Sequence, residues 1–455
     1  MDLVWGKGVP MREKPSNGGV KEMRAKKMLV FQFAIIFLAL GLCVVPALSQ
    51  EKVKIEYWIL GTSEELAIEQ KAVQMFEERN PNIDVVERHA PGEEYYDKLR
   101  ASIAAGSIPD LMRIIVEEYQ SFAKGGVLLN IKPAIEKKLQ EDPNFAEWWN
   151  DIEPKLLEPF YYQGGLFGIP HDWNDAIIFY NKALFDKAGL AYPRKDWDVN
   201  EFLEIAKKLT VDENGDGKPD QYGYLLTGDW FDCIAPWIFT FGGKILDDAW
   251  KKCLLDTQES KQAIQFMYDL VNTYKVSPPP TVMEFTSGMA MWMTGKIGMA
   301  HYGRYMVPAF RQIKDFEWDC QHQPFGPNGT RGVPYGVGLT CIAAKTKYPE
   351  ESFKLAVFLS STEVQQMYNE YGNSIQVLKS IIYSDDFKNP DKPPFNQYAM
   401  VEALEYAQLI PSPPRNREII RVATSELDRV LLNQKSVEDA ARDMTVQIDE
   451  ILAEE

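Results

Sequence analysis

The chain has 455 residues and a net charge of −17, so it is too long for one ordinary core and suits two domains. Residues 1–49 carry a net charge of +4, which leaves −21 on the remainder. This acidity excludes nucleic acid as an expected partner, because phosphate binding needs a basic stripe.

Residues 1–49 have the order of a secretory signal peptide. Basic residues from Lys21 to Lys27 precede an apolar run from Leu29 to Leu48, and small residues at 47 and 49 predict cleavage before Gln50. The sequence therefore predicts export to the periplasm or the extracellular face of the membrane. Two alternatives stay open: the run is long enough for a retained membrane anchor, and Cys43 is a candidate for lipidation.

Strands and helices alternate after this leader. Alternating and β-rich stretches predict strands over 52–60, 82–90, 111–116 and within 165–181. Helical spacing predicts helices over 63–80, 95–105, 182–189, 199–210, 259–275 and 350–370, and one long helix near 415–453. Asp198 is the expected N-cap of the helix at 199. This alternation indicates an α/β class with a parallel sheet.

Several stretches, in this order, resemble the substrate-binding proteins of ABC importers, in the group that includes maltose-binding protein. They are "AAGSIPDLMRI", "GLFGIPHDWNDAIIFYNKALFDKAGL", "WDVNEFLEIAKKLT" and "TKYPEESFKLAVFLSSTEVQQMY". The resemblance covers nearly all of residues 53–453. One departure is Gln376, which stands where the family often has proline.

The resemblance implies a two-lobed periplasmic-binding-protein fold (type II), with lobes joined by three crossing segments and a ligand cleft between them. Lobe one is expected to comprise 50–170 with 335–375, and lobe two 171–334 with 376–455. The implied crossings lie near 168–172, 333–338 and 373–377. Hinge closure would bring both lobes onto the ligand.

The implied function is reversible capture of a sugar or oligosaccharide and its delivery to the permease subunits of an ABC importer. The resemblance implies no enzyme activity, no required cofactor and a monomer. The alternatives are a binder of a polyamine, a phosphate ester or an acidic sugar, and a secreted glycoside-active enzyme. No G-x-S-x-G, H-E-x-x-H or P-loop motif supports an enzyme. Cys233, Cys253, Cys320 and Cys341 form no CxxC pair, which argues against zinc or thiol redox chemistry.

Sugars need aromatic platforms and planar polar side chains. The stretch from Phe285 to Tyr305 contributes to such a site by resemblance, as a helix to Thr294 and a strand over 296–302, with Tyr305 in the following loop where the family carries a stacking tryptophan. The candidate ligand contacts are Trp58, Thr62, Glu64, Arg113, Glu117, Asp172, Trp173, Asn174, Trp230, Asp232, Arg304, Tyr305 and Tyr335. The alternatives are core packing for each aromatic residue, a solvated salt bridge for Arg113 and Glu117, and helix capping for Glu64.

A metal site is the last candidate. The stretch "DENGDGKPDQYG" matches calcium-loop positions 1, 3, 5, 7 and 9 at Asp212, Asn214, Asp216, Lys218 and Asp220. The twelfth position is Gly223 instead of a bidentate glutamate, so the full match fails. A truncated calcium loop and an Asx-rich turn without an ion both stay open.

Overall fold

The structure is a computed structural model that describes residues 52–454, with the side chains of Glu64 and Glu93 excepted. The leader predictions for residues 1–49 lie outside this range. Within it, no helix is both long and apolar enough to cross a membrane.

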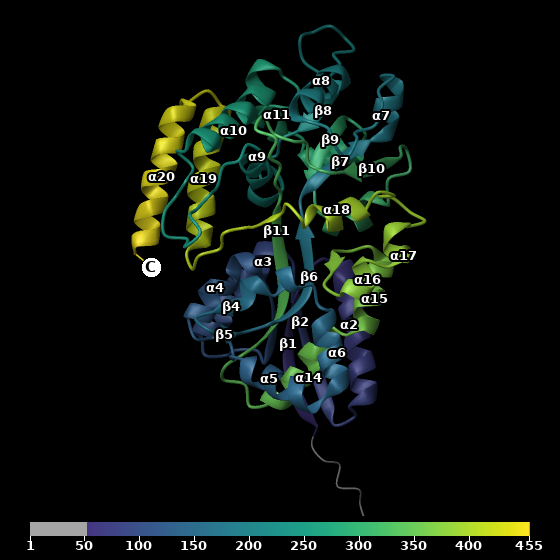
Figure 1. Cartoon of the computed structure of the whole chain (residues 1–455), viewed down its shortest axis with the longest axis vertical. Helices are drawn as coiled ribbons and strands as arrows, with labels where there is room; N and C mark the ends of the chain where they lie inside the picture. Colours follow the sequence, from purple (N-terminus) through teal and green to yellow (C-terminus); the bar gives the residue numbers. More distant parts are fainter. Residues whose placement is uncertain (1–51, 455) are drawn as a thin grey trace, which may run out of the picture. The chain divides into compact units, whose positions relative to one another are not determined.

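The larger sheet has seven strands in the order β12-β6-β11-β3-β1-β2, with β13 beside β11. Figure 1 labels four of them, β1, β2, β6 and β11. Its strands are β1 (Val53–Leu60), β2 (Ile83–Ala90), β3 (Leu111–Ile115), β6 (Ile169–Asp175), β11 (Pro334–Ile342), β12 (Ile375–Gln376) and β13 (Gln408–Leu409). The first three strands are parallel, as the βαβ alternation predicts. In contrast, β11 runs antiparallel between β3 and β6.

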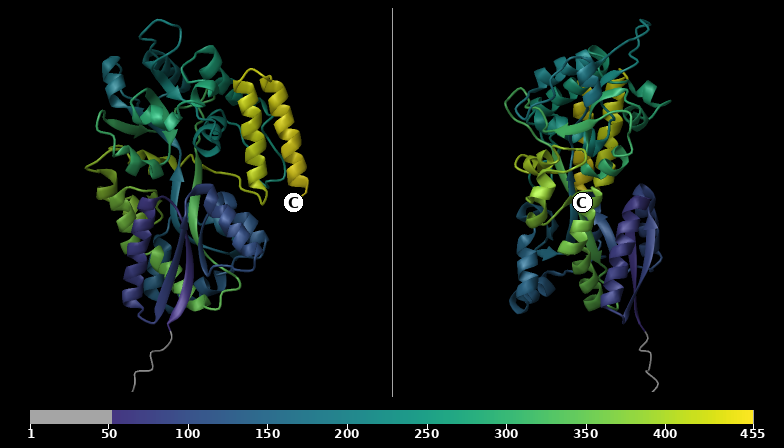
Figure 2. Two further views of the ribbon diagram at one scale, coloured as in Figure 1. Left: turned by 180° about the vertical axis from the view of Figure 1, so that it is seen from behind. Right: turned by 90° about the vertical axis from the view of Figure 1, so that its right-hand side faces the viewer.

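The smaller sheet has four strands in the order β10-β7-β9-β8. They are β7 (Ile177–Asn181), β8 (Tyr222–Leu225), β9 (Ile297–Tyr302) and β10 (Trp318–Gln321). Only Ala176 separates β6 from β7, so one extended segment passes from the larger sheet to the smaller. We call the larger sheet with its helices lobe one and the smaller sheet with its helices lobe two; Figure 2 shows them from two further sides.

Helices cover both sheets. Around the larger sheet are α2 (Ser63–Arg79), α3 (Gly92–Ala104), α4 (Val116–Lys124), α5 (Lys132–Glu141), α6 (Pro143–Asp151), α14 (Pro349–Leu359), α15 (Thr362–Tyr371), α16 (Lys379–Ile382) and α17 (Asp385–Lys388). Around the smaller are α7 (Lys182–Lys187), α8 (Val199–Leu209), η3 (Trp230–Ile234), α9 (Ala235–Thr240), α10 (Gln258–Tyr268), η4 (Asp269–Thr273), α11 (Pro280–Met283), α12 (Gly288–Met293), η5 (Arg304–Met306), α13 (Val307–Phe310), α18 (Tyr398–Ala403), α19 (Asn416–Leu431) and α20 (Val437–Ala453). A short hairpin of β4 (Tyr161–Tyr162) and β5 (Gly165–Leu166) follows η1 (Pro154–Leu156) and η2 (Glu158–Phe160).

Helix starts follow their capping residues. Asp198 caps α8 and forms a capping box with Glu201, which confirms the predicted N-cap. Thr62 and Glu65 form the same box at the start of α2. Each box satisfies backbone N–H groups that have no partner inside the helix.

The predicted single helix near 415–453 is wrong, because α19 and α20 are separate helices. The chain between them turns at Asn433, whose φ is +57°, and Ser436 then caps α20 by accepting from the N–H of Asp439. Similarly, the stretch 350–370 forms two helices. The helix expected from Phe285 starts only at Gly288, and Phe285 is 88% exposed.

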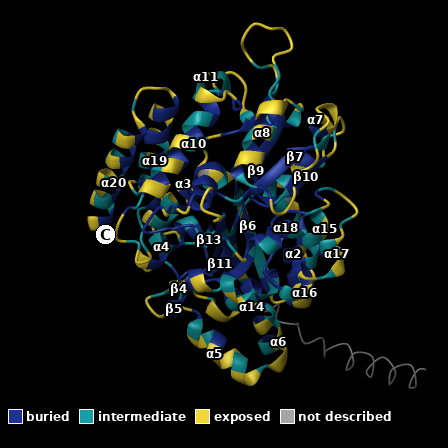
Figure 3. Ribbon diagram, turned by 45° about the horizontal axis from the view of Figure 1, so that its top comes forward, coloured by how far each residue is buried: buried dark blue, intermediate teal, exposed yellow. Residues whose placement is uncertain are grey.

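Each lobe has a buried apolar core, drawn dark blue in Figure 3, while exposed residues lie on the outer faces of the helices. The core of lobe one centres on β1, β3, β6 and β11, and it extends into the smaller sheet through residues such as Phe179 and Trp318. The four cysteines after the leader are buried and free.

Candidate functional site

The strands β6 and β11 form the floor of the candidate site. Asp172 lies opposite Gly338, and Asn174 lies opposite Gly336. A Cβ atom at Gly338 would lie 2.2 Å from Asp172 Oδ1, so this position requires glycine while Asp172 keeps its place. A Cβ at Gly336 would lie 3.3 Å from the Phe231 ring and 3.4 Å from Glu117 Oε1. Phe231 belongs to lobe two and Glu117 to lobe one, so residues of both lobes lie beside the segment Gly336–Gly338 of β11. We call this segment the glycine strip.

A buried network of charges holds Asp172. Arg113 on β3 donates to Asp172 Oδ1 at 2.7 Å and to Glu69 Oε1 at 3.2 Å. His171 Nε2 lies 3.1 Å from Glu69 Oε1. Burial favours the neutral carboxyl of Asp172, but Arg113 and His171 outweigh burial and hold its pKa well below its usual range. Arg113 is therefore part of a buried ion cluster and not of a solvated pair.

The pKa values of His171 and Glu69, the partners of Asp172 and Arg113, also reflect a competition between burial and neighbouring charges. Burial and Arg113 oppose a positive charge on His171, yet the carboxylates of Glu69 and Asp172 raise its pKa. Burial opposes ionisation of Glu69, and His171 and Arg113 lower its pKa nonetheless. The network is thus held in its charged form by mutual attraction.

Asn174 has one buried atom without a partner. Its Nδ2 donates to Ser374 Oγ at 3.2 Å. No donor among residues 52–454 reaches Asn174 Oδ1. A buried acceptor without a donor costs free energy, and it suits a ligand hydroxyl.

Lobe two contributes a second unpaired acceptor. Tyr305 donates its hydroxyl hydrogen to Asp232 Oδ2, while Asp232 Oδ1 is buried without a partner in the described part of the chain. Burial and the neighbouring Asp229 raise the pKa of Asp232, and the hydrogen bond from Tyr305 only partly offsets them.

Glu117 lies at the first turn of α4, beside Gly336. Burial raises its pKa to about 7, and the carboxylates of Glu118 and Asp229 add to this shift. At neutral pH its carboxyl exists in both protonation states, so it can donate as well as accept a hydrogen bond.

A family model described as bacterial extracellular solute-binding protein matches residues 61–366. The chain belongs to the bacterial extracellular solute-binding proteins. Among its relatives is a multiple sugar-binding protein of Streptococcus mutans, 21% identical over 76% of this chain and 79% of the relative.

Solved structures share the fold of this solute-binding protein. An ABC substrate-binding protein from Listeria monocytogenes in complex with cycloalternan matches with a TM-score of 0.80 at 24% identity, over 88% of this chain and 99% of that one. A maltose-bound protein of T. maritima matches with a TM-score of 0.73 at 21% identity, over 88% and 100%. These matches confirm the predicted two-lobed α/β binding-protein fold.

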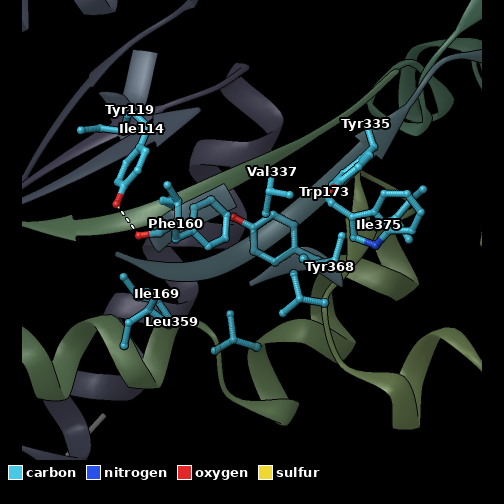
Figure 4. Close-up of a cluster of buried hydrophobic side chains, with 14 of the residues drawn as sticks. Ile114, Tyr119, Phe160, Ile169, Trp173, Tyr335, Val337, Leu359, Tyr368 and Ile375 are labelled. Atoms are coloured by element: carbon cyan, nitrogen blue, oxygen red, sulfur yellow. Dashed lines mark hydrogen bonds between the residues drawn. The ribbon is translucent and has the colours of Figure 1, made fainter. Parts of the chain in front are cut away.

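In this solute-binding protein, several predicted stacking residues lie in the core. Trp173 is fully buried and donates its indole N–H to the carbonyl of Gln376 at 2.9 Å. Figure 4 shows Trp173 and Tyr335 inside one cluster of buried side chains. Trp230 is 5% exposed and packs against α10 and α19. Trp173, Trp230 and Tyr335, which the sequence places among the candidate ligand contacts, therefore offer no open ring face, because neighbouring side chains cover them, with Lys155 Nζ 5.3 Å from the centre of the Tyr335 ring.

Arg304 also differs from its predicted role. It is 1% exposed, and its guanidinium donates to the carbonyl of Ser374, to Asn369 Oδ1 at 3.2 Å and to Gln397 Oε1 at 3.4 Å. Burial lowers its pKa to about 9, and Arg311 contributes to the lowering. Arg304 thus fastens lobe two to the loop before β12 through its two terminal Nη groups, while its buried Nε has no partner in the described part of the chain.

The remaining candidates lie at the edges of the site. Trp58 is half-buried and donates to Glu56 Oε1 at 2.8 Å, with its ring edge-on to Tyr95. Thr62 serves as the cap of α2. The side chain of Glu64 lies outside the described residues.

The structure adds residues that the sequence prediction missed. Glu69, Asp229, Phe231 and Ser374 contact predicted site residues or lie beside them. The helical spacing of α2 could have identified Glu69, because Glu69 lies on the same buried face as Ala72, Val73 and Phe76. An acid at that spacing needs a buried partner.

The carboxylates of the predicted calcium loop face backbone amides. Asp212 accepts from the N–H groups of Gly215 at 2.7 Å and Gly217 at 2.8 Å, and Asp220 accepts from that of Glu213 at 2.9 Å. Within residues 52–454, no group of three or more His, Cys, Asp or Glu side chains is spaced to hold a metal ion. These contacts have the form of the Asx-rich turn, and calcium binding by the loop stays a prediction.

Proposed function

We propose that this solute-binding protein is the carbohydrate-binding component of an ABC importer. The observation that carries the proposal is the pair of buried, unpartnered acceptors, Asn174 Oδ1 and Asp232 Oδ1, contributed by different lobes beside the glycine strip of β11. Sugar hydroxyl groups supply donors that such acceptors need. The names of the relatives, including the multiple sugar-binding protein of S. mutans, support the same ligand class.

Charge compensation favours a neutral ligand over the charged alternatives. The charge of Asp172 is matched by Arg113, and burial raises the pKa values of Asp232 and Glu117. A polyamine would meet few uncompensated carboxylates. A phosphate ester or an acidic sugar would find Arg113 engaged with Asp172, and both Nη groups of the buried Arg304 engaged with Ser374, Asn369 and Gln397.

The proposed mechanism is closure of the lobes on the sugar. The continuous passage from β6 to β7 and the strand β11 connect the lobes, while Asn174 and Asp232 lie on opposite sides. A ligand that bonds both favours the closed form only through contacts it lacks in the open form. The closed, loaded protein then delivers the sugar to the permease subunits on the outer face of the membrane, without chemical change to the sugar.

A thermal-shift panel tests this proposal. Neutral oligosaccharides should raise the melting temperature by mass action, whereas spermidine and glucose 6-phosphate should not. Asn174→Ala should remove the shift, while the matched control Asn200→Ala, on the exposed face of α8, should keep it. A shift only with spermidine or the phosphate ester would contradict the sugar assignment, and hydrolysis products in the sample would contradict the absence of catalysis.

A further inference from the structure

A hollow of about 520 Å³ lies between the lobes, beyond the end of the glycine strip. Lobe one lines it with α4 and the β4–β5 hairpin, and lobe two lines it with the loop 248–251. Three aromatic residues face it: Tyr161, Tyr162 and Trp250. Tyr161 is 51% exposed although its ring is large and apolar. Gln120, Gln163 and Asp248 add polar groups to its lining.

Two turns that contain non-glycine residues with positive φ hold the aromatic residues of the hollow. Gln163 has a φ of +48° and precedes Gly164 at +79°, the pattern of a type I′ hairpin turn. Trp250 has a φ of +54°, and its N–H donates to the carbonyl of Asp247 at 2.9 Å. Five non-glycine residues in the described part of the chain have positive φ, and two of them line this hollow. Such strain persists where the surroundings hold it, and it clusters at ligand clamps.

The hollow joins the candidate site along α4. Gln120 follows Glu117 by three residues, so the two side chains are neighbours on one helix face. On the opposite wall, Asn416 donates to the carbonyl of Glu117 at 3.4 Å, and its own N–H donates to the carbonyl of Pro413, which lines the hollow. The two walls therefore meet at Glu117, and the hollow begins about one helical turn further along α4.

We propose that the hollow is an outer carbohydrate subsite, and that the ligand is an oligosaccharide whose inner end occupies the site at Gly336. This inference rests on the proposed function. Aromatic faces pack against the apolar C–H faces of sugar rings, and amide and carboxylate groups fix the hydroxyls. Because both lobes line the hollow, a sugar unit there adds contacts that favour the closed form.

The test compares ligand length in the wild type and in the double variant Tyr161→Ala/Trp250→Ala. Isothermal titration uses the di- to hexasaccharides of the maltose, mannose, arabinose and galactose series. The wild type should bind the longer members of its preferred series more tightly than the disaccharide. The variant should lose about tenfold in affinity for those longer members, as expected for two aromatic contacts, and keep its disaccharide affinity.

Matched variants separate a specific effect from a general one. Tyr274→Ala removes a tyrosine that is 38% exposed away from the hollow, and it should leave all affinities unchanged. The single variant Tyr161→Ala, at an exposed position, keeps the test available if the double variant does not fold. Unchanged binding of long chains, or an equal loss for every length, overturns the outer subsite. Absence of binding by every sugar overturns the proposed function itself, which is a distinct result.

Discussion

Tyr305 donates its hydroxyl hydrogen to the buried carboxyl group of Asp232. The contact joins η5, which follows β9, to η3, which follows β8. Because β8 and β9 are parallel neighbours, their carboxyl ends lie side by side. Ligands of open α/β sheets bind at such an edge, so we expect this pair to lie on the face of lobe two that meets the ligand.

Replacement of Tyr305 should affect folding as well as binding. Tyr305→Phe removes one hydrogen bond and should lower the free energy of unfolding by about 1 kcal/mol. Tyr305→Ala also removes the ring that packs beside Gly303, and it should cost about 2–4 kcal/mol. Denaturant unfolding measures both values. Equal stability of the wild type and Tyr305→Ala would show that the ring and its hydrogen bond contribute nothing to folding.

Glu117 should make stability and sugar affinity depend on pH. Its pKa is about 7 in the folded state and about 4.3 in an unfolded chain, so the folded state binds more protons between these values. Stability is therefore fully present below about pH 4.3 and falls as pH rises to about 7, by about 1–2 kcal/mol for this half-buried group. Glu117→Gln should remove this fall.

Glu87 provides the control for this experiment, because burial also raises its pKa to about 7 although it lies on β2. Glu87→Gln should flatten the stability profile in the same direction. Only Glu117→Gln should change the pH profile of sugar affinity, as measured by titration calorimetry. An identical affinity profile in both variants would remove Glu117 from the binding site.

Loss of Arg113 should be far more costly than loss of a surface arginine. Arg113→Met leaves Asp172 and Glu69 buried without their cation, which should cost about 3–5 kcal/mol. The control Arg79→Met breaks an exposed pair with Glu363 and should cost less than about 1 kcal/mol. Comparable losses in chemical unfolding would contradict the role of the buried network.

The buried network of Arg113, Asp172, Glu69 and His171 predicts that stability falls at both low and high pH. The pKa values of Asp172 and Glu69 are lowered, so their contribution is present above about pH 4 and is lost as pH falls further. The pKa of His171 is raised, so its contribution is complete below about pH 6.5 and is lost as pH rises through its folded value. His171→Gln should abolish the loss on the alkaline side and also reduce the loss on the acid side, because His171 helps to lower the pKa values of Asp172 and Glu69; pH-dependent unfolding would resolve both changes.

The loop at Asp212 should keep its shape without a metal ion. Its carboxylates already accept backbone hydrogen bonds, so EDTA should leave the melting temperature unchanged. A drop on chelation would contradict this expectation. A rise with millimolar calcium in the wild type, lost in Asp212→Ala, would establish the truncated calcium loop.

The sequence predicts local structure well where one helix or strand decides it. The alternation of strands and helices and the cap at Asp198 follow from nearby residues, whereas the strand that ends at Tyr302 is implied by the family resemblance. Even the missed break before α20 had a local signal, since Ser436 precedes Asp439 as a capping residue does.

Contacts between distant residues account for the errors at the site. Arg113 lies 44 residues from Glu69 and 59 from Asp172, so sequence spacing cannot reveal their network. The burial of Trp173 depends equally on remote neighbours, because its backbone pairs with β11 and β12 and its indole N–H donates to the carbonyl of Gln376. The local sequence around a tryptophan in a β-rich stretch does not distinguish a ring that stacks on a sugar from a ring that packs in the core.

The burial of Arg304 constrains how the lobes move. With a pKa of about 9, this side chain remains a cation at neutral pH, and it bonds Ser374 and Asn369 without a carboxylate partner. Pulling η5 away from that loop would leave a dry positive charge and several carbonyl groups unsatisfied. Motions that keep η5 beside this loop preserve these bonds, whereas a gap at Glu117 would first break the bonds that join Asn416 and Arg417 of α19 to α4.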